Sequence, residues 1–129
     1  MKDTNPKKIF GQAKPGMSAV PQIALLCLGQ AMQEGAEKYG VFNWRETRVD
    51  VSTYYNAAMR HWMLYFSGED YDPKTGLHHL GYAMACAAVL LDADRMGVLE
   101  DDRPVDGGEL AEFIRIHTKT IQEKPDERR

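Results

Sequence analysis

An acidic loop separates two unusually apolar stretches of the chain. Residues 53–66, before the loop, carry one permanently charged side chain, Arg60, and residues 77–91, after it, carry none. The loop itself holds three carboxylates within four residues: Glu69, Asp70 and Asp72. Crowded carboxylates repel one another, and hard divalent cations prefer oxygen ligands. We therefore expect a metal ion at this loop; the alternative is a polar connector in which Asp72 begins a turn at Pro73.

A second pair of carboxylates, Glu34 and Glu37, has helical spacing. Residues three apart lie on one face of a helix, and this pair falls near the end of the first expected helix. Each carboxylate there is disfavoured by about 0.3–1 kcal/mol, because a helix C-terminus carries partial negative charge. Either Lys38 or a metal ion would compensate for this charge, whereas a solvated acidic face is the alternative interpretation.

The side chains that follow this pair are of the types that bind a nucleotide. Two cations, an amide and an indole stand close together in the sequence: Lys38, Asn43, Trp44 and Arg45. Cations bind phosphates, an indole stacks on a purine, and an amide hydrogen-bonds to a base edge or a sugar. The alternative is that Trp44 only anchors its loop to the core, which is the commoner role of a lone tryptophan.

Arg60 and His61 lie together in the first apolar stretch, and His78 and His79 stand near the start of the second. An arginine in a helix without other charges requires a carboxylate or phosphate partner. A histidine on an apolar face is more often a hydrogen-bonded core residue than a ligand. Because adjacent helical residues point about 100° apart, we expect at most one of His78 and His79 to face a common site.

Four helices are expected to position these side chains. Proline and glycine divide the chain, and the helical ranges are about 18–39, 52–67, 76–97 and 109–121. The second and third helices lack a polar face, which places both in the core. No alternating apolar run predicts a strand. We therefore predict an all-α fold, a compact bundle of about four helices.

The length of the chain predicts one domain with short extensions. We assign residues 1–17 to a flexible N-terminal arm, 18–123 to a single helical catalytic domain and 124–129 to a charged tail. Two helices without a polar face cannot both be covered by two other short helices. We therefore expect an oligomer, in which the Ala- and Gly-rich third helix packs against its counterpart in another copy.

Composition excludes several classes of function. A net charge of −3 and a pI near 5.8 give no broad basic surface for a nucleic acid polymer. Cys27 and Cys86 lack the spacing of a metal site, and we expect reduced core thiols, which fit the cytoplasm. The N-terminus has no apolar signal region, and residues 77–91 fall short of the roughly 20 residues that span a membrane. We therefore expect a soluble protein without membrane association.

Five motifs follow one another between residues 25 and 92: Gly35–Gly40, Asn43–Arg45, Arg60–His61, Gly68–Pro73 with Gly76, and His79–Leu80. In this order they resemble the motifs of the phage dATP/dGTP diphosphohydrolase domain. That group is similar to MazG among the all-α nucleoside triphosphate pyrophosphohydrolases. The ordered set is far more specific than any single motif.

This resemblance implies a metal-dependent pyrophosphohydrolase. With Mg²⁺ or Mn²⁺, such an enzyme converts a (deoxy)nucleoside triphosphate to the monophosphate and pyrophosphate, and the expected substrate here is a purine nucleotide, dGTP or dATP or both. Related phage enzymes belong to pathways that replace adenine with 2-aminoadenine, which implies the cytoplasm of an infected bacterium. MazG-like enzymes assemble as dimers or dimers of dimers, so the resemblance also implies self-association.

The resemblance assigns roles to the candidate residues, with one departure from the MazG pattern. Glu34 and Glu37 match its first ExxE element, whereas His79–Tyr82 replaces the later ExxD element. The expected metal ligands are therefore Glu34, Glu37, Glu69, Asp70 and Asp72. The expected nucleotide-binding residues are Lys38, Asn43, Trp44, Arg45, Arg60 and His61. The expected catalytic residues are Glu34, Glu37, Lys38, Arg60 and His79, and a carboxylate or His79 accepts the proton of the attacking water.

Two other functions use the same residue types. A non-enzymatic helical module that binds a nucleotide or a metal ion would need the same carboxylates and cations. In a helical interaction protein, Trp44 and the acidic loop would be only structural. Turnover of a nucleotide distinguishes an enzyme from both alternatives.

Overall fold

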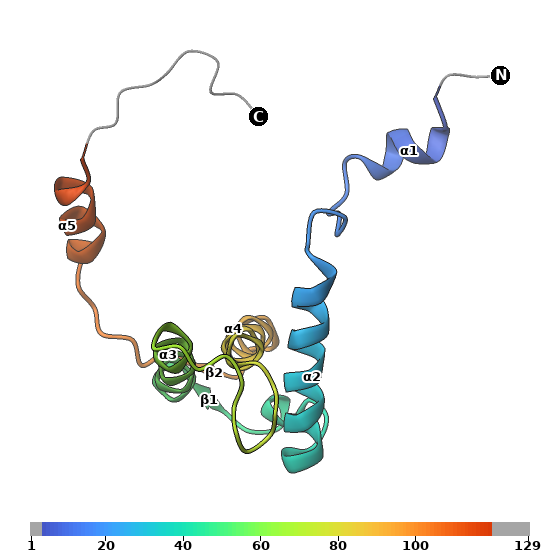
Figure 1. Ribbon diagram of the computed structural model, residues 1–129. Helices are drawn as coiled ribbons and strands as arrows, with labels where there is room; N and C mark the ends of the chain where they lie inside the picture. Colours follow the sequence, from blue (N-terminus) through green and yellow to red (C-terminus); the bar gives the residue numbers. More distant parts are fainter. Residues whose placement is uncertain (1–3, 120–129) are drawn as a thin grey trace.

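The computed structural model describes residues 4–119, and their regular structure is almost entirely helical (Figure 1). The helices are α1 (Pro6–Gly11), α2 (Gln22–Tyr39), α3 (Val51–Phe66), α4 (His79–Met96) and α5 (Glu109–His117). A 3₁₀ turn covers Asn43–Arg45, and two short strands, β1 (Val49–Asp50) and β2 (Leu99–Glu100), pair in parallel. The predicted all-α class is confirmed. The strand pair was not predicted, because two residues are too few to show an alternating pattern.

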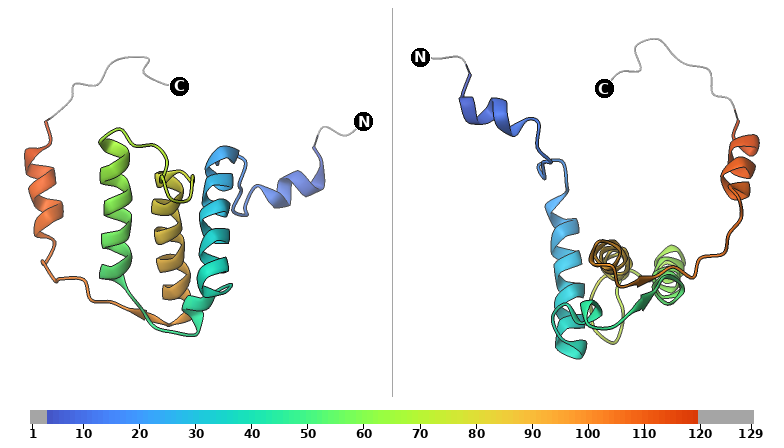
Figure 2. Two further views of the ribbon diagram at one scale, coloured as in Figure 1. Left: turned by 60° about the horizontal axis from the view of Figure 1, so that its bottom comes forward. Right: turned by 180° about the vertical axis from the view of Figure 1, so that it is seen from behind.

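Helix α4 lies between α2 and α3 in a single layer (Figure 2). Helices α2 and α4 run in one direction, and α3 runs in the opposite direction. Five buried residues belong to α4: His79, Gly81, Ala83, Val89 and Ala93. Glycine at 81 permits a close approach of α2, since a Cβ at that position would lie 2.7 Å from the carbonyl oxygen of Cys27. Three small residues of α4 are buried within the chain, Gly81, Ala83 and Ala93, whereas Ala87 is exposed; packing of α4 against another copy stays a prediction.

A small core closes the layer at the C-terminal half of α4. Its buried members are Trp44, Val49, Val89 and Ala93. The strand pair beside it joins the start of α3 to the residues after α4, with Val49 opposite Leu99. Asp102 then accepts hydrogen bonds from the Ser52 backbone N–H, at 2.9 Å, and from its hydroxyl, in the first turn of α3. These contacts fix the direction in which α3 leaves the core.

The outer face of α3 is apolar and uncovered. Four side chains at helical spacing line it: Tyr55, Met59, Trp62 and Phe66, here called the α3 stripe. The exposed fraction reaches 90% at Phe66, and no residue of α3 is buried. The sequence placed α3 in the core, and for the single chain this is wrong, because only one side of α3 packs on α4 (Figure 2).

Helices α1 and α5 stand apart from the layer of α2, α3 and α4 (Figures 1 and 2). Helix α1 lies inside the segment expected to be a flexible arm; Asn5 caps it by accepting a hydrogen bond from the Lys7 N–H at 2.8 Å. Residue Ile121, the expected end of the last helix, and the expected tail at 124–129 lie outside the described residues. Of the helices described, none is long and apolar enough to cross a membrane.

Gly81→Ala should lower the free energy of unfolding by about 1–3 kcal/mol, because the new methyl group would collide with the backbone of α2. Gly29→Ala is the matched control, since a Cβ there meets no atom within 4 Å. Alanine is favoured over glycine inside a helix by up to about 1 kcal/mol, so the control should be neutral or stabilising. Chemical denaturation followed by circular dichroism measures both changes. Wild-type stability of Gly81→Ala would contradict the close packing of α2 on α4.

Candidate functional site

Polar side chains that contact one another form a row across the layer at the N-terminal half of α4. Its members come from α2, α3, α4 and the loop between α3 and α4: Glu34, Lys38, His61, Glu69, Thr75, His79 and Tyr82, here called the polar network. Five of these seven residues were candidates from the sequence. Thr75 and Tyr82 were missed as site residues, because neither carries a charge that would single it out.

Two histidines from different helices meet at one end of the network. His79 is 1% exposed. Its Nδ1 atom lies 2.8 Å from Nδ1 of His61, and its Nε2 atom lies 2.7 Å from Oε1 of Glu69. The neighbouring His78 has a different role, because its Nδ1 accepts the Leu80 N–H at 3.0 Å and so caps α4.

Tyr82 joins these histidines to α2. Its ring stacks on His61, with centroids 4.7 Å apart and planes 18° from parallel. Its hydroxyl lies 3.1 Å from Oε1 of Glu34 and 2.9 Å from Oγ1 of Thr75. Because a carboxylate only accepts, the hydroxyl donates to Glu34 and accepts from Thr75. The second oxygen of Glu34 lies 2.8 Å from Nζ of Lys38.

Partial burial shifts the pKa values of two residues in this network, Tyr82 and His61. Burial raises the pKa of the Tyr82 hydroxyl; the hydrogen bond from Thr75 opposes this, and the contact with Glu34 raises the pKa further, so Tyr82 stays a donor. Burial lowers the pKa of His61, and neighbouring His79 and Arg60 lower it further, against the opposing charge of Asp72. Neutral imidazole is therefore the favoured form of His61.

The five expected metal ligands do not converge. Within residues 4–119, no group of three His, Cys, Asp or Glu side chains is placed to hold a metal ion. Glu69 is bonded to His79, and Glu37 and Asp70 are exposed. Asp72 accepts a hydrogen bond from the Lys74 N–H at 2.8 Å, which is the turn expected as the alternative to a metal site. The charge of Asp72 also raises the pKa values of His61 and Tyr82.

Trp44 and Arg45 belong to a separate cluster around Asp92. The indole N–H of buried Trp44 donates to Oδ2 of Asp92 at 2.7 Å. Arg45 binds the same carboxylate through two hydrogen bonds of 2.8 Å, and its guanidinium lies 4.1 Å from the centre of the Phe42 ring. The geometry supports the structural interpretation of Trp44, whose indole is only 7% exposed and packs in the core. Asp92 was missed, although a carboxylate within an apolar helix requires a partner.

The two remaining nucleotide-binding candidates lie outside both clusters. Asn43 begins the 3₁₀ turn and is half-buried. Arg60 is exposed on α3, and among the described residues its side chain has no hydrogen bond or ion pair. Among Lys38, Arg45 and Arg60, only Arg60 therefore lacks a carboxylate partner in the part of the chain that the structure describes.

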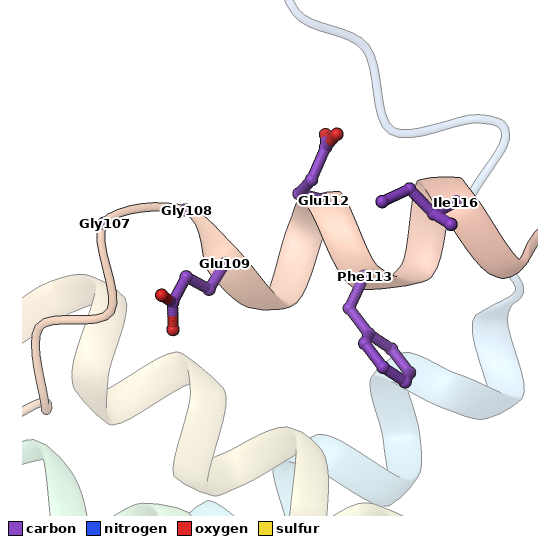
Figure 3. Close-up of a pocket in the computed structure, with 6 residues that line it drawn as sticks. All are labelled: Gly107, Gly108, Glu109, Glu112, Phe113 and Ile116. Atoms are coloured by element: carbon purple, nitrogen blue, oxygen red, sulfur yellow. The ribbon is translucent and has the colours of Figure 1, made fainter.

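A hollow beside α5 is unrelated to the polar network. Its lining comes only from α5 and the turn before it, as Figure 3 shows: Gly107, Gly108, Glu109, Glu112, Phe113 and Ile116. These side chains combine two carboxylates with apolar groups and offer no cation for a phosphate. The polar network remains the better candidate site.

Comparison with known families gives one match. A family model described as dATP/dGTP diphosphohydrolase, N-terminal, matches residues 4–103. No curated protein and no solved structure gives a significant match. The matched range contains α1 to α4, both strands, the polar network and the Asp92 cluster, and it ends before α5.

Asp92→Asn should lower stability at neutral pH and flatten its dependence on pH in acid. Hydrogen bonds from Arg45 and Trp44 hold the pKa of Asp92 at about 2, below its ordinary value of 3.8. The stabilisation is therefore complete above the ordinary value and is lost as the pH falls from about 4 to about 2. Denaturation midpoints measured across this range test it, with Asp94→Asn, an exposed carboxylate on the same helix, as control. An unchanged acid profile in Asp92→Asn would contradict the assignment.

Proposed function

The chain belongs to the dATP/dGTP diphosphohydrolase N-terminal family, and from this premise we propose that it hydrolyses a purine deoxynucleoside triphosphate to the monophosphate and pyrophosphate. The family match is the observation that carries the proposal, because its description names both the substrates and the reaction class. The polar network supports the location of the reaction. It lies within the matched range and combines cations, carboxylates and imidazoles at one place in the layer.

We propose Mg²⁺ or Mn²⁺ as the cofactor, held by carboxylates near the network. Oxygen donors suit these hard cations, and Mg²⁺ is commonly bound by one or two carboxylates together with the phosphates of the substrate. Because no three candidate ligands converge within residues 4–119, we propose that the ion binds together with the nucleotide. One or two of the candidate carboxylates would hold it: Glu34, Glu37, Asp70 or Asp72. When bound, the ion would neutralise phosphate charge and lower the pKa of a water molecule.

The protein's own cations would bind the triphosphate. Lys38 lies on the network through Glu34, and Arg60 is exposed on the neighbouring helix α3. Both would offset the charge that develops on the phosphates as water attacks the α-phosphorus and pyrophosphate leaves. Arg45 is bound to Asp92, so we assign the phosphates to Lys38 and Arg60. We assign binding of the purine base to Asn43 and its surroundings, because Trp44 is buried.

The biological setting follows from the resemblance to phage enzymes. Conversion of dGTP to dGMP would supply a pathway that replaces adenine with 2-aminoadenine, in the cytoplasm of an infected bacterium. A preference for dGTP would fit that pathway, whereas a preference for dATP would mean that the chain removes adenine nucleotides from the pool.

We also propose that the chain self-associates as a dimer or a dimer of dimers through the α3 stripe. Soluble monomers rarely expose a large contiguous apolar patch. A twofold axis would place the stripe of one copy on that of another, so apolar side chains would face apolar side chains. The polar network includes His61 of α3, so assembly through this helix would lie close to the site.

Incubation with dGTP or dATP and Mg²⁺ or Mn²⁺ should yield monophosphate and pyrophosphate, without diphosphate and only with the metal. Glu34→Gln should reduce turnover at least tenfold, because it removes a charge from the network, whereas Glu46→Gln, an exposed carboxylate outside it, should not. Chromatography of the products measures both. Orthophosphate as the first product would exclude this reaction class, and nucleotide binding without turnover would favour the non-enzymatic binding module.

Trp62→Asp should convert the assembly to monomers, because a charge in the α3 stripe would have to be buried between two copies. Val105→Asp is the control, since Val105 is 97% exposed in the connector before α5. Light scattering coupled to size-exclusion chromatography gives the mass of each variant. A wild-type protein with the mass of a monomer at micromolar concentration would contradict the proposed assembly.

A further inference from the structure

His79 cannot itself take a proton from a water molecule at the site. The side chain is 1% exposed, and both ring nitrogens are engaged, one by Glu69 and one by His61. A buried imidazole held at both nitrogens can position a neighbour, but it has no free lone pair for a reactant. The proton acceptor must therefore be sought one step further along the network.

With both histidines neutral, the hydrogen bonds assign one position to each proton. An ionised carboxylate only accepts, so Nε2 of His79 carries a hydrogen and donates it to Glu69. In neutral His79 the Nδ1 atom then accepts, and the 2.8 Å contact requires Nδ1 of His61 to donate. Neutral His61 is left with its lone pair on Nε2.

The lone pair of His61 is accessible. Among the described residues, Nε2 of His61 has no hydrogen-bond partner. In the same part of the chain, every fully buried side-chain nitrogen or oxygen does have a partner, so this atom is not fully buried. The Nε2 atom is therefore open to solvent. Stacking on Tyr82 fixes the plane of the ring, and burial lowers the pKa of His61.

We propose that His61 accepts the proton of the attacking water at Nε2, with His79 and Glu69 as positioning residues. This inference rests on the proposed hydrolysis. The water oxygen bonds to the α-phosphorus, its O–H bond breaks, the proton passes to Nε2, and the electron pair of the broken P–O bond leaves with pyrophosphate. Glu69 fixes the tautomer of His79, and His79 fixes that of His61, as a buried carboxylate does for histidine in hydrolytic triads. The two oxygens of Glu34 are occupied by Lys38 and Tyr82, so Glu34 is the weaker candidate.

Substitution of His61 tests the proposal through kcat and KM separately. His61→Gln should reduce kcat by about 100-fold or more, with KM changed less than about threefold, because general bases contribute about 10²–10⁴ to the rate. Glu69→Gln should reduce kcat at least tenfold through the wrong tautomer. His78→Asn is the control and should keep wild-type kcat, since asparagine preserves the cap of α4. Circular dichroism and binding of a non-hydrolysable dGTP analogue verify the fold of each variant.

NMR of the imidazole nitrogens supplies a readout that is independent of activity. The wild-type protein should show His61 with its proton on Nδ1 and His79 with its proton on Nε2, and Glu69→Gln should shift the His61 signals. The opposite tautomer of His61, or undiminished kcat in His61→Gln, would overturn this inference alone. A wild-type protein with the expected tautomers that hydrolyses none of the nucleotides would overturn the proposed function and, with it, the role of His61.

Discussion

The position of α4 between two other helices is the constraint on which the rest of the structure depends. A helix covered on both sides must offer small side chains where a neighbour comes close, as Gly81 does against the backbone of α2. It must also satisfy every polar group it buries. At the N-terminal half of α4, His79 and Tyr82 reach across to α3 and α2; at the C-terminal half, Asp92 binds the loop of Trp44 and Arg45. The two polar clusters therefore hold the layer together at both ends.

A buried histidine is costly unless both of its nitrogens are bonded, and here each bond does more than satisfy a polar group. The bond to Glu69 closes the acidic loop over the start of α4, and the bond to His61 sets one ring orientation on α3. The hydrogen bonds that offset the cost of burying His79 thus leave Nε2 of His61 without a partner, near the charges of Asp72 and Arg60. Stability and the capacity for acid–base chemistry have one physical origin in this network.

The sequence was sufficient for helices α2 to α5 and insufficient for the contacts between them. Gly40 and Gly97 ended α2 and α4 as expected, because each adopts a positive φ that other residues avoid. Helix α1 and the strand pair gave no periodic signal. The composition of α3 predicted burial, but composition alone does not say whether an apolar helix face packs within its own chain. Residue types identified Glu34, Lys38, His61, Glu69 and His79, whereas the pairing of Trp44 with Asp92, 48 positions apart, depends on the tertiary fold.

We propose that the polar network, rather than the Asp92 cluster or α5, binds the triphosphate. The most direct measurement is an amide NMR titration with Mg²⁺ and a non-hydrolysable dGTP analogue. We expect saturable shifts that are largest around Lys38, His61, Glu69 and Tyr82, with little change at α5. Shifts confined to α5, or to the turn containing Trp44 and Arg45, would contradict it.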